Sequence, residues 1–238
     1  MQHKYTVLSS LLLACTLTAC GGGGDGDATA TPGPAGQVQG RWVTAAGSAP
    51  SYTAVGVPAS NSSTALWLLA NDASRLVKLT VQDSGALAGK AYALGQGTPA
   101  TAVTGAWSAP AAKSLSLSGV VNGSLALAQT DALTAAAVQT DAAGAWKATA
   151  GGNAQSVTWT VADSGALTGS STTGCTYQGN LTAMSNASAY TAAVKESCSD
   201  GTSTQYNGIA TINPARNALS MVATSPDESV GVALFLSK

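Results

Sequence analysis

Histidine and charge are what this sequence most lacks. Its one histidine, His3, lies in an expected signal peptide, and Asp, Glu, Lys and Arg make up 9% of the 238 residues, with a formal net charge of −1. Typical domains carry about 25% charged residues. A mature chain without histidine excludes Ser-His-Asp and Cys-His catalysis and histidine-ligated metals. Without a basic patch to neutralise phosphates, we expect no nucleic-acid partner. We assign no catalytic residue, metal site or cofactor.

The N-terminal segment has the pattern of a lipoprotein signal peptide. A short basic head precedes the apolar stretch VLSSLLLACTLTA, residues 7–19, which is shorter than the roughly 20 residues that a membrane-spanning helix needs. The following Leu17-Thr18-Ala19-Cys20 resembles the lipobox of bacterial lipoproteins. That resemblance implies cleavage before Cys20, diacylglycerol on its sulfur and acylation of the new amine, which together hold a protein firmly on a membrane.

Two alternatives to this interpretation remain. Leu12-Leu13-Ala14-Cys15 is also lipobox-like, but it leaves a very short apolar core. The second alternative is that the segment is an ordinary secretion signal in which the cysteine is incidental. Four glycines directly after Cys20 favour the lipobox interpretation, because a lipid-bearing residue needs a flexible connection to the folded protein.

Residues 20–37 are predicted to be the lipidated cysteine and a flexible tether. The segment is rich in Gly, Ala, Thr and Pro and has no apolar period. Its CGGGG start resembles that of Gram-negative surface lipoproteins of the factor H-binding and transferrin-binding types. The resemblance covers only the tether. It favours an outer-membrane location, on the periplasmic or the surface face, with the membrane as a partner through the lipid.

Two cysteines remain for the folded part, Cys175 and Cys198. An even pair in an exported chain predicts a disulfide. We expect their Cα atoms to lie about 4.4–6.8 Å apart.

Period-two alternation dominates the rest of the chain and predicts antiparallel strands with one face on a core. In LVKLTVQ, residues 76–82, Val77, Leu79 and Val81 share a face, and in QSVTWTV, residues 155–161, Val157, Trp159 and Val161 do. In SLSLSGVV, residues 114–121, the shared face is Leu115, Leu117 and Val121. In SVGVALFLSK, residues 229–238, it is Val230, Val232, Leu234 and Leu236.

An internal echo predicts a duplicated β unit. LTVQDSGALAG at 79–89 and WTVADSGALTG at 159–169 are identical at eight of eleven positions. Each predicts a hairpin with an Asp-Ser-Gly turn, in which Asp83 and Asp163 accept hydrogen bonds from turn amides. Val81, Val161, Leu87 and Leu167 should then be buried, and Thr80, Thr160, Ser84 and Ser164 exposed. Gly-x-Trp also recurs, at residues 40–42, 105–107 and 144–146.

The fold prediction is all-β: two similar antiparallel β units, each a small barrel or sandwich, in tandem after a signal peptide and tether. We place the signal peptide at 1–19, the lipidated tether at 20–37, the first unit at 38–135 and the second, with the disulfide, at 136–238. The stretch TDALTAAAVQTDAAGAW, residues 130–146, connects the units.

The second half resembles a largely uncharacterised group of proteobacterial outer-membrane lipoproteins. Its matching pieces are Gly144-Ala145-Trp146, Gly165-Ala166-Leu167-Thr168-Gly169, Gly174-Cys175, Gly179, Cys198 and Gly208-Ile209-Ala210. The resemblance covers about the last 95 residues. It implies a compact antiparallel β fold and brings no catalytic residues.

The function that these observations favour is a lipid-anchored envelope lipoprotein with a non-enzymatic binding or structural role, and an envelope protein or glycan as possible partner. Its ligand-binding residues stay unassigned, because the five tryptophans are more typical of a core than of a binding face. The alternative is an envelope glycan hydrolase that uses paired carboxylates, which need roughly 5 Å or 6.5–9.5 Å between them. Its candidates are Asp72, Asp83, Asp131, Asp141, Asp163, Glu196, Asp200, Asp227 and Glu228. Most of them lie in predicted turns.

The anchor prediction is tested by Cys20→Ala. Without the thiol that carries the lipid, the variant should lose membrane partitioning and accumulate as precursor with its signal peptide. Cell fractionation and intact mass measure both effects. A variant that fractionates with membranes as well as the parent would show that Cys20 is not the anchor.

Overall fold

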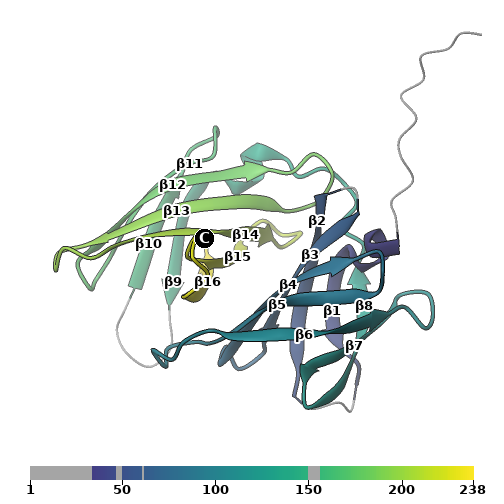
Figure 1. Cartoon of the computed structure of the whole chain (residues 1–238). Helices are drawn as coiled ribbons and strands as arrows, with labels where there is room; N and C mark the ends of the chain where they lie inside the picture. The colour runs from purple at the N-terminus through teal and green to yellow at the C-terminus, as the bar shows by residue number, and fades with distance from the viewer. Residues whose placement is uncertain (1–33, 47–49, 61, 150–155) are drawn as a thin grey trace, which may run out of the picture. The chain divides into compact units, whose positions relative to one another are not determined.

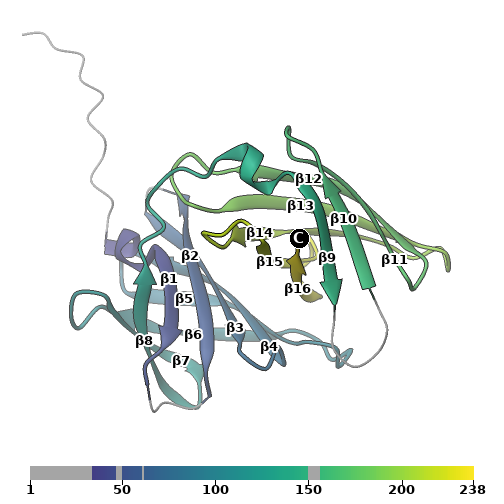
Figure 2. The same ribbon diagram turned by 180° about the vertical axis from the view of Figure 1, so that it is seen from behind.

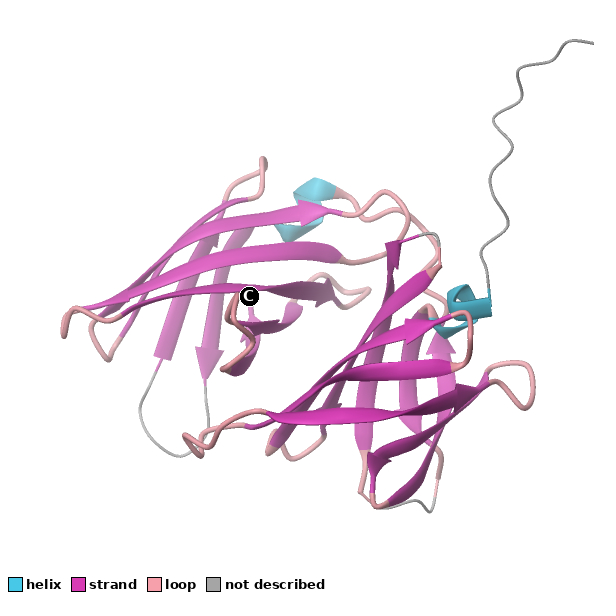
Figure 3. Cartoon of the chain, in the orientation of Figure 1, coloured by secondary structure: helices cyan, strands magenta, loops and turns pink. Residues whose placement is uncertain are grey.

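The computed structural model describes residues 34–46, 50–60, 62–149 and 156–238. Strands are the main regular structure of these residues, and loops and two short 3-10 helices connect them (Figure 3). Cys20, the signal peptide and most of the tether lie outside the described residues. None of the helices in the described ranges has the length and apolarity to cross a bilayer.

The first eight strands form a closed antiparallel barrel, seen from two sides in Figures 1 and 2. Each strand pairs with its neighbours in the chain, and the first pairs with the last. The strands are β1 (Gly40–Thr44), β2 (Tyr52–Ser60), β3 (Ser63–Ala70), β4 (Arg75–Gln82), β5 (Ala86–Ala93), β6 (Thr101–Ser108), β7 (Ser114–Val121) and β8 (Gly123–Asp131).

The next eight strands form a second closed barrel with the same order, in which β9 pairs with both β10 and β16. The strands are β9 (Gly144–Thr149), β10 (Ser156–Val161), β11 (Ala166–Ser171), β12 (Cys175–Ala183), β13 (Tyr190–Cys198), β14 (Ser203–Ile212), β15 (Ala218–Thr224) and β16 (Gly231–Ser237). Both barrels belong to one compact unit, Pro32–Lys238. The predicted all-β tandem of two similar antiparallel units is confirmed, and each unit is a barrel.

The echoed hairpins occupy equivalent places in the two barrels. Val81 pairs with Leu87 and Val161 pairs with Leu167, and all four side chains are at most 2% exposed. The threonines and serines expected outside are exposed, at positions 80, 84, 160 and 164. Gly85 and Gly165 close the turns with φ of 87° and 89°, which glycine adopts without strain. The predicted duplication of this hairpin is confirmed.

The expected role of the turn aspartates is wrong. Asp83 accepts a hydrogen bond of 2.6 Å from the amide of Ala35, which lies outside its own turn. The serines bond to the turns instead: Ser84 Oγ and Ser164 Oγ accept from the amides of Ala86 and Ala166. The reason is that Asp83 faces the segment that crosses the barrel end.

That segment is η1 (Pro34–Val38), a 3-10 helix at one end of the first barrel. The composition of residues 34–37 predicts a flexible tether, but Ala35 and the following Val38 are at most 1% exposed, so this end of the segment belongs to the folded part. The buried Thr64 donates its hydroxyl to the Ala35 carbonyl at 2.6 Å. These contacts hold the helix against β3 and β4.

The Gly-x-Trp motifs at residues 40–42 and 144–146 have the same structural role in the two barrels. Each follows a 3-10 helix, η1 or η2 (Gln139–Ala142), and starts the first strand of its barrel. The indole Nε1 of Trp42 donates to the Val38 carbonyl at 2.9 Å, and that of Trp146 donates to Ala142 at 2.8 Å. Both indoles are at most 2% exposed, so each tryptophan ties its 3-10 helix to the core.

The core positions follow the predicted alternation with two corrections, at Val121 and at Val230. Leu115 and Leu117 are buried, but the next buried side chain on β7 is Val120, at 1% exposure, and Val121 is only partly buried. The register shifts between Ser118 and Val121, where Gly119 has φ of 80°. Between these two residues β7 advances three positions while β8 advances one, and this β-bulge interrupts the alternation, so that Val120 and not Val121 is buried. On the last strand, Leu236 is buried, Val232 and Leu234 pack against the core, and Val230 lies outside the strand and is exposed.

Replacing Trp146 by Phe should lower the free energy of unfolding by about 1–3 kcal/mol, because the Ala142 carbonyl loses its buried donor. Urea unfolding followed by circular dichroism measures the change. Trp107→Phe is the matched control, since the Trp107 indole is only partly buried and its bond to the Gln82 carbonyl is exposed. An equal loss in both variants would contradict the assigned role of Trp146.

Candidate functional site

The outer faces of the two barrels meet over an apolar cluster. Trp67 from β3 and Tyr92 from β5 pack with Ile209 from β14 and with Ala187 and Ala189, all buried at 6% exposure or less. Trp67 is buried, as expected of a core tryptophan, but the cluster it joins lies on the outer face of β3 and not in the barrel interior. The run Leu66-Trp67-Leu68 is buried on both faces of β3, with Trp67 on the outer face toward the second barrel.

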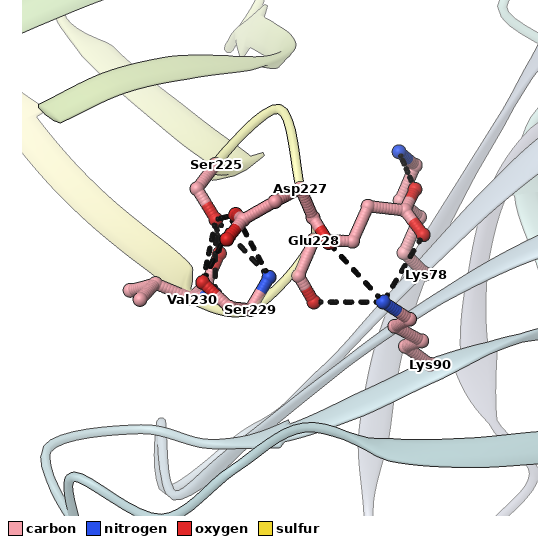
Figure 4. A network of polar contacts seen from close by, with 7 residues as sticks. All are labelled: Lys78, Lys90, Ser225, Asp227, Glu228, Ser229 and Val230. Carbon is pink, nitrogen blue, oxygen red and sulfur yellow. Dashed lines mark hydrogen bonds and ion pairs between the residues drawn. The ribbon is translucent and has the colours of Figure 1, made fainter.

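A polar network beside this cluster links the barrels (Figure 4). Glu228, in the β15–β16 loop, forms an ion pair with Lys78 of β4 at 2.6 Å. Lys90 of β5 donates to the backbone carbonyls of Asp227 and Glu228 at 3.3 and 3.2 Å. The Lys78 and Glu228 side chains are 30% and 37% exposed, so solvent screens the pair and it contributes little to stability.

The loop that presents Glu228 is held by hydroxyl groups. Ser225 and Ser229 donate to Asp227 Oδ1 at 2.5 and 2.9 Å (Figure 4). These hydrogen bonds lower the pKa of Asp227 to about 2, the Ser225 bond most. The Glu228 backbone has φ of 55°, a conformation rare for residues other than glycine. The loop is therefore shaped to present the Glu228 carboxylate and carbonyl to the lysines.

Two cavities lie alongside this contact, between the outer faces of the barrels. The first cavity has a volume of about 350 Å³ and is walled by β1–β3 of one barrel and β14–β16 of the other. The second cavity has a volume of about 520 Å³ and extends along the connecting segment 131–141 and the β14–β15 turn. Three residues line both cavities: Arg41, Thr211 and Ser220. We call the two together the inter-barrel cleft.

Arg41 lies where the two cavities meet. It is on the outer face of β1, between the buried Gly40 and Trp42. Within the described part of the chain, its guanidinium has neither a hydrogen bond nor an ion pair. Burial lowers the pKa of Arg41, and the charge of the nearby Asp131 acts in the opposite direction. A half-buried guanidinium offers five donors, which burial makes costly to leave without an acceptor.

Two of the nine candidate carboxylates, Asp131 and Asp141, line the second cavity. Each already has a partner. Asp141 forms an ion pair with Arg216 at 3.2 Å, and Asp131 accepts from the Leu133 amide at 2.9 Å. Tyr190 in the same cavity donates its hydroxyl to the Val138 carbonyl at 2.7 Å. Burial raises the pKa of Tyr190 to about 12, so this hydroxyl stays protonated at neutral pH.

Most other candidate carboxylates have structural partners. Asp72 and Asp200 sit in turns and accept from Ser74 and Thr202, whose hydroxyl bonds lower the pKa of each carboxyl. Glu196 accepts from the hydroxyls of Tyr177 and Tyr206 at 2.8 and 3.5 Å. The Asp163 carboxylate is exposed at its hairpin turn.

Cys175 and Cys198 form the expected disulfide. They are direct cross-strand neighbours on β12 and β13, with Cα atoms 3.9 Å apart, just below the expected 4.4–6.8 Å. Their amides donate to Ser171 Oγ and the Thr202 carbonyl, so this is a non-hydrogen-bonded pair, in which Cα atoms lie closest. Glu196 lies within 4.8 Å of both sulfurs, but disulfide sulfurs are not the thiolates that bind metals.

Sequence reasoning missed Arg41 as a site residue. The strand Gly40-Arg41-Trp42 shows that Arg41 faces away from the core, but not that another barrel covers that face. The usable signal was the rarity of charge, since only ten lysines and arginines occur in the chain.

No match to a known protein supports the resemblances of the signal peptide, the tether and the second half, which stay predictions. Among protein-family models, curated proteins and solved structures, none matches this chain.

Proposed function

We propose that this protein is a lipid-anchored envelope lipoprotein with a non-enzymatic binding role, and that it binds its ligand in the inter-barrel cleft. The anchor would be the lipid on Cys20, and the outer membrane the location, as the Leu17-Thr18-Ala19-Cys20 pattern and the glycines after it favour. The disulfide is consistent with an oxidising compartment.

One observation carries the binding role. The cleft is lined by a half-buried guanidinium, that of Arg41, which has no acceptor among the described residues. Concave sites with apolar walls and a few polar groups are where proteins bind small molecules, typically in 300–1,000 Å³. Buried cations without partners are costly to stability, so an arginine kept in this state favours a role in binding.

The barrel interiors are less suitable for a ligand. Eight-stranded barrels have room for packed side chains or for one small ligand. Here Trp42 occupies the first interior, and Trp146 and Trp159 occupy the second, all at most 2% exposed. The cleft between outer faces is therefore the better candidate.

Filling the cleft should remove the ligand. Ser220 is a half-buried residue that lines both cavities, so Ser220→Trp places an indole across their junction. We expect native mass spectrometry of protein extracted from envelopes in mild detergent to show a bound small molecule on the parent and none on Ser220→Trp. Ser170→Trp, at an exposed position of β11, is the control and should keep the ligand. Retention by Ser220→Trp, or no bound molecule on the parent, would contradict the proposal.

The second candidate function is an envelope glycan hydrolase. The observation that favours it is that Asp131 and Asp141 line one cavity. Against it, both carboxylates already have partners, Asp141 through Arg216. Incubation with purified peptidoglycan and measurement of new reducing ends tests it. We expect no release above that of the Asp131→Asn/Asp141→Asn double variant; release that depends on these two residues would establish the hydrolase instead.

A further inference from the structure

The chemistry of the first cavity identifies the class of ligand, on the premise that the proposed binding role is correct. Its walls are apolar on both barrels. They include Val55, Trp67, Leu69, Ile209, Val222 and Phe235. Trp67 and Ile209 are buried, whereas Phe235, which also lines the cavity, is 51% exposed. An exposed aromatic ring beside buried apolar walls is typical of a surface that a ligand covers.

Among the described residues that line this first cavity, Arg41 is the one that is ionisable. The other polar residues there are neutral: Thr53, Asn71, Thr211 and Ser220. Thr53 and Asn71 bond to each other at 3.0 Å. The charge of the first cavity is therefore positive, and its complement is a single negative charge.

Asp131 does not provide that charge. It lines the second cavity and not the first, and its carboxylate accepts from the Leu133 amide. In the second cavity, Arg216 is paired with Asp141, so these two charges cancel locally. Arg41 therefore brings its positive charge to an apolar cavity. The negative charge of Asp131, which lines only the second cavity, offsets that charge only in part.

We propose that the first cavity binds a small apolar carboxylate, with its carboxylate on the guanidinium of Arg41 and its apolar body between Trp67 and Phe235. Guanidinium and carboxylate match as two parallel charge-assisted hydrogen bonds, which are stronger than neutral ones. A cavity of about 350 Å³ takes a body of the size of a medium-chain acyl group or a fused pair of aromatic rings. Fatty acids and aromatic acids share this chemistry.

Isothermal titration calorimetry with matched probes tests the proposal. The probes are decanoate and 2-naphthoate, each beside its neutral amide, decanamide and 2-naphthamide. The parent protein should bind at least one carboxylate about tenfold or more tighter than its amide, since only the acid forms charge-assisted bonds. The acid that binds more tightly, decanoate or 2-naphthoate, shows whether the cavity prefers an aliphatic or an aromatic ligand.

Two variants assign this preference to Arg41. Arg41→Gln should bring the carboxylate affinity down to that of the amide and leave the amide affinity within about threefold. Asp131→Asn should tighten carboxylate binding, because it removes the opposing charge. Lys195→Gln, which removes one positive charge at an exposed position of β13, is the control and should bind like the parent. Circular dichroism and thermal melting verify that each variant is folded.

The outcomes separate this inference from the proposed function. If the parent binds acid and amide equally, and Ser220→Trp abolishes both, the cleft binds ligands but the carboxylate assignment is overturned. If no probe binds the parent, or acid binding survives Ser220→Trp, the carboxylate assignment is overturned, and the native mass spectra of the parent and Ser220→Trp decide the proposed function separately. The acid preference of the parent decides the matter even if Arg41→Gln does not fold.

Discussion

Closure of each eight-stranded sheet on itself is the constraint on which the rest of this structure depends. Strands that are neighbours in the chain pair as hairpins, and only β1–β8 and β9–β16 must join residues far apart in sequence. Closure removes both sheet edges and so satisfies the backbone hydrogen bonds that an open sheet would expose. It also divides every strand into an inner face and an outer face, and the inner faces are packed with apolar side chains.

A barrel with a filled interior can form a site only on its outer face or at its ends. Here the outer faces of the two barrels provide it, because a duplicated unit places two such faces in one chain. The barrels use their outer faces differently. In the first barrel, β3 is apolar on both sides, so Trp67 covers the second barrel while Leu66 and Leu68 fill its own core.

The contact between the barrels is not built for maximal stability. Trp67 Nε1 and Tyr92 Oη are buried there without hydrogen-bond partners among the described residues, and each such group costs about 1–3 kcal/mol. Burial, together with the nearby charges of Glu228 and Asp227, raises the pKa of Tyr92 to about 12, so its hydroxyl keeps its proton. The ion pair of Lys78 and Glu228 is too exposed to offset these costs. Apolar burial therefore holds this contact, and the cleft beside it contains an arginine, Arg41, that has no partner in the described part of the chain.

Much of the fold could be predicted from the sequence alone, because it depends on interactions between residues close together in the chain. Three signals depend only on near neighbours in the chain or on the expected compartment. They are the alternation of apolar residues along strands, the Asp-Ser-Gly turn repeated at 83–85 and 163–165, and an even pair of cysteines in a chain predicted to be exported. They predicted strands, the duplicated hairpin, the tandem β units and the Cys175–Cys198 disulfide.

Tertiary structure decided the rest. The bulge at Gly119 exchanges Val121 for Val120, because the register of β7 shifts there in its pairing with β8. The positions of Trp67 and Arg41 in the cleft depend on which outer faces meet, and period-two patterns say only that a side chain points outward, not what covers it.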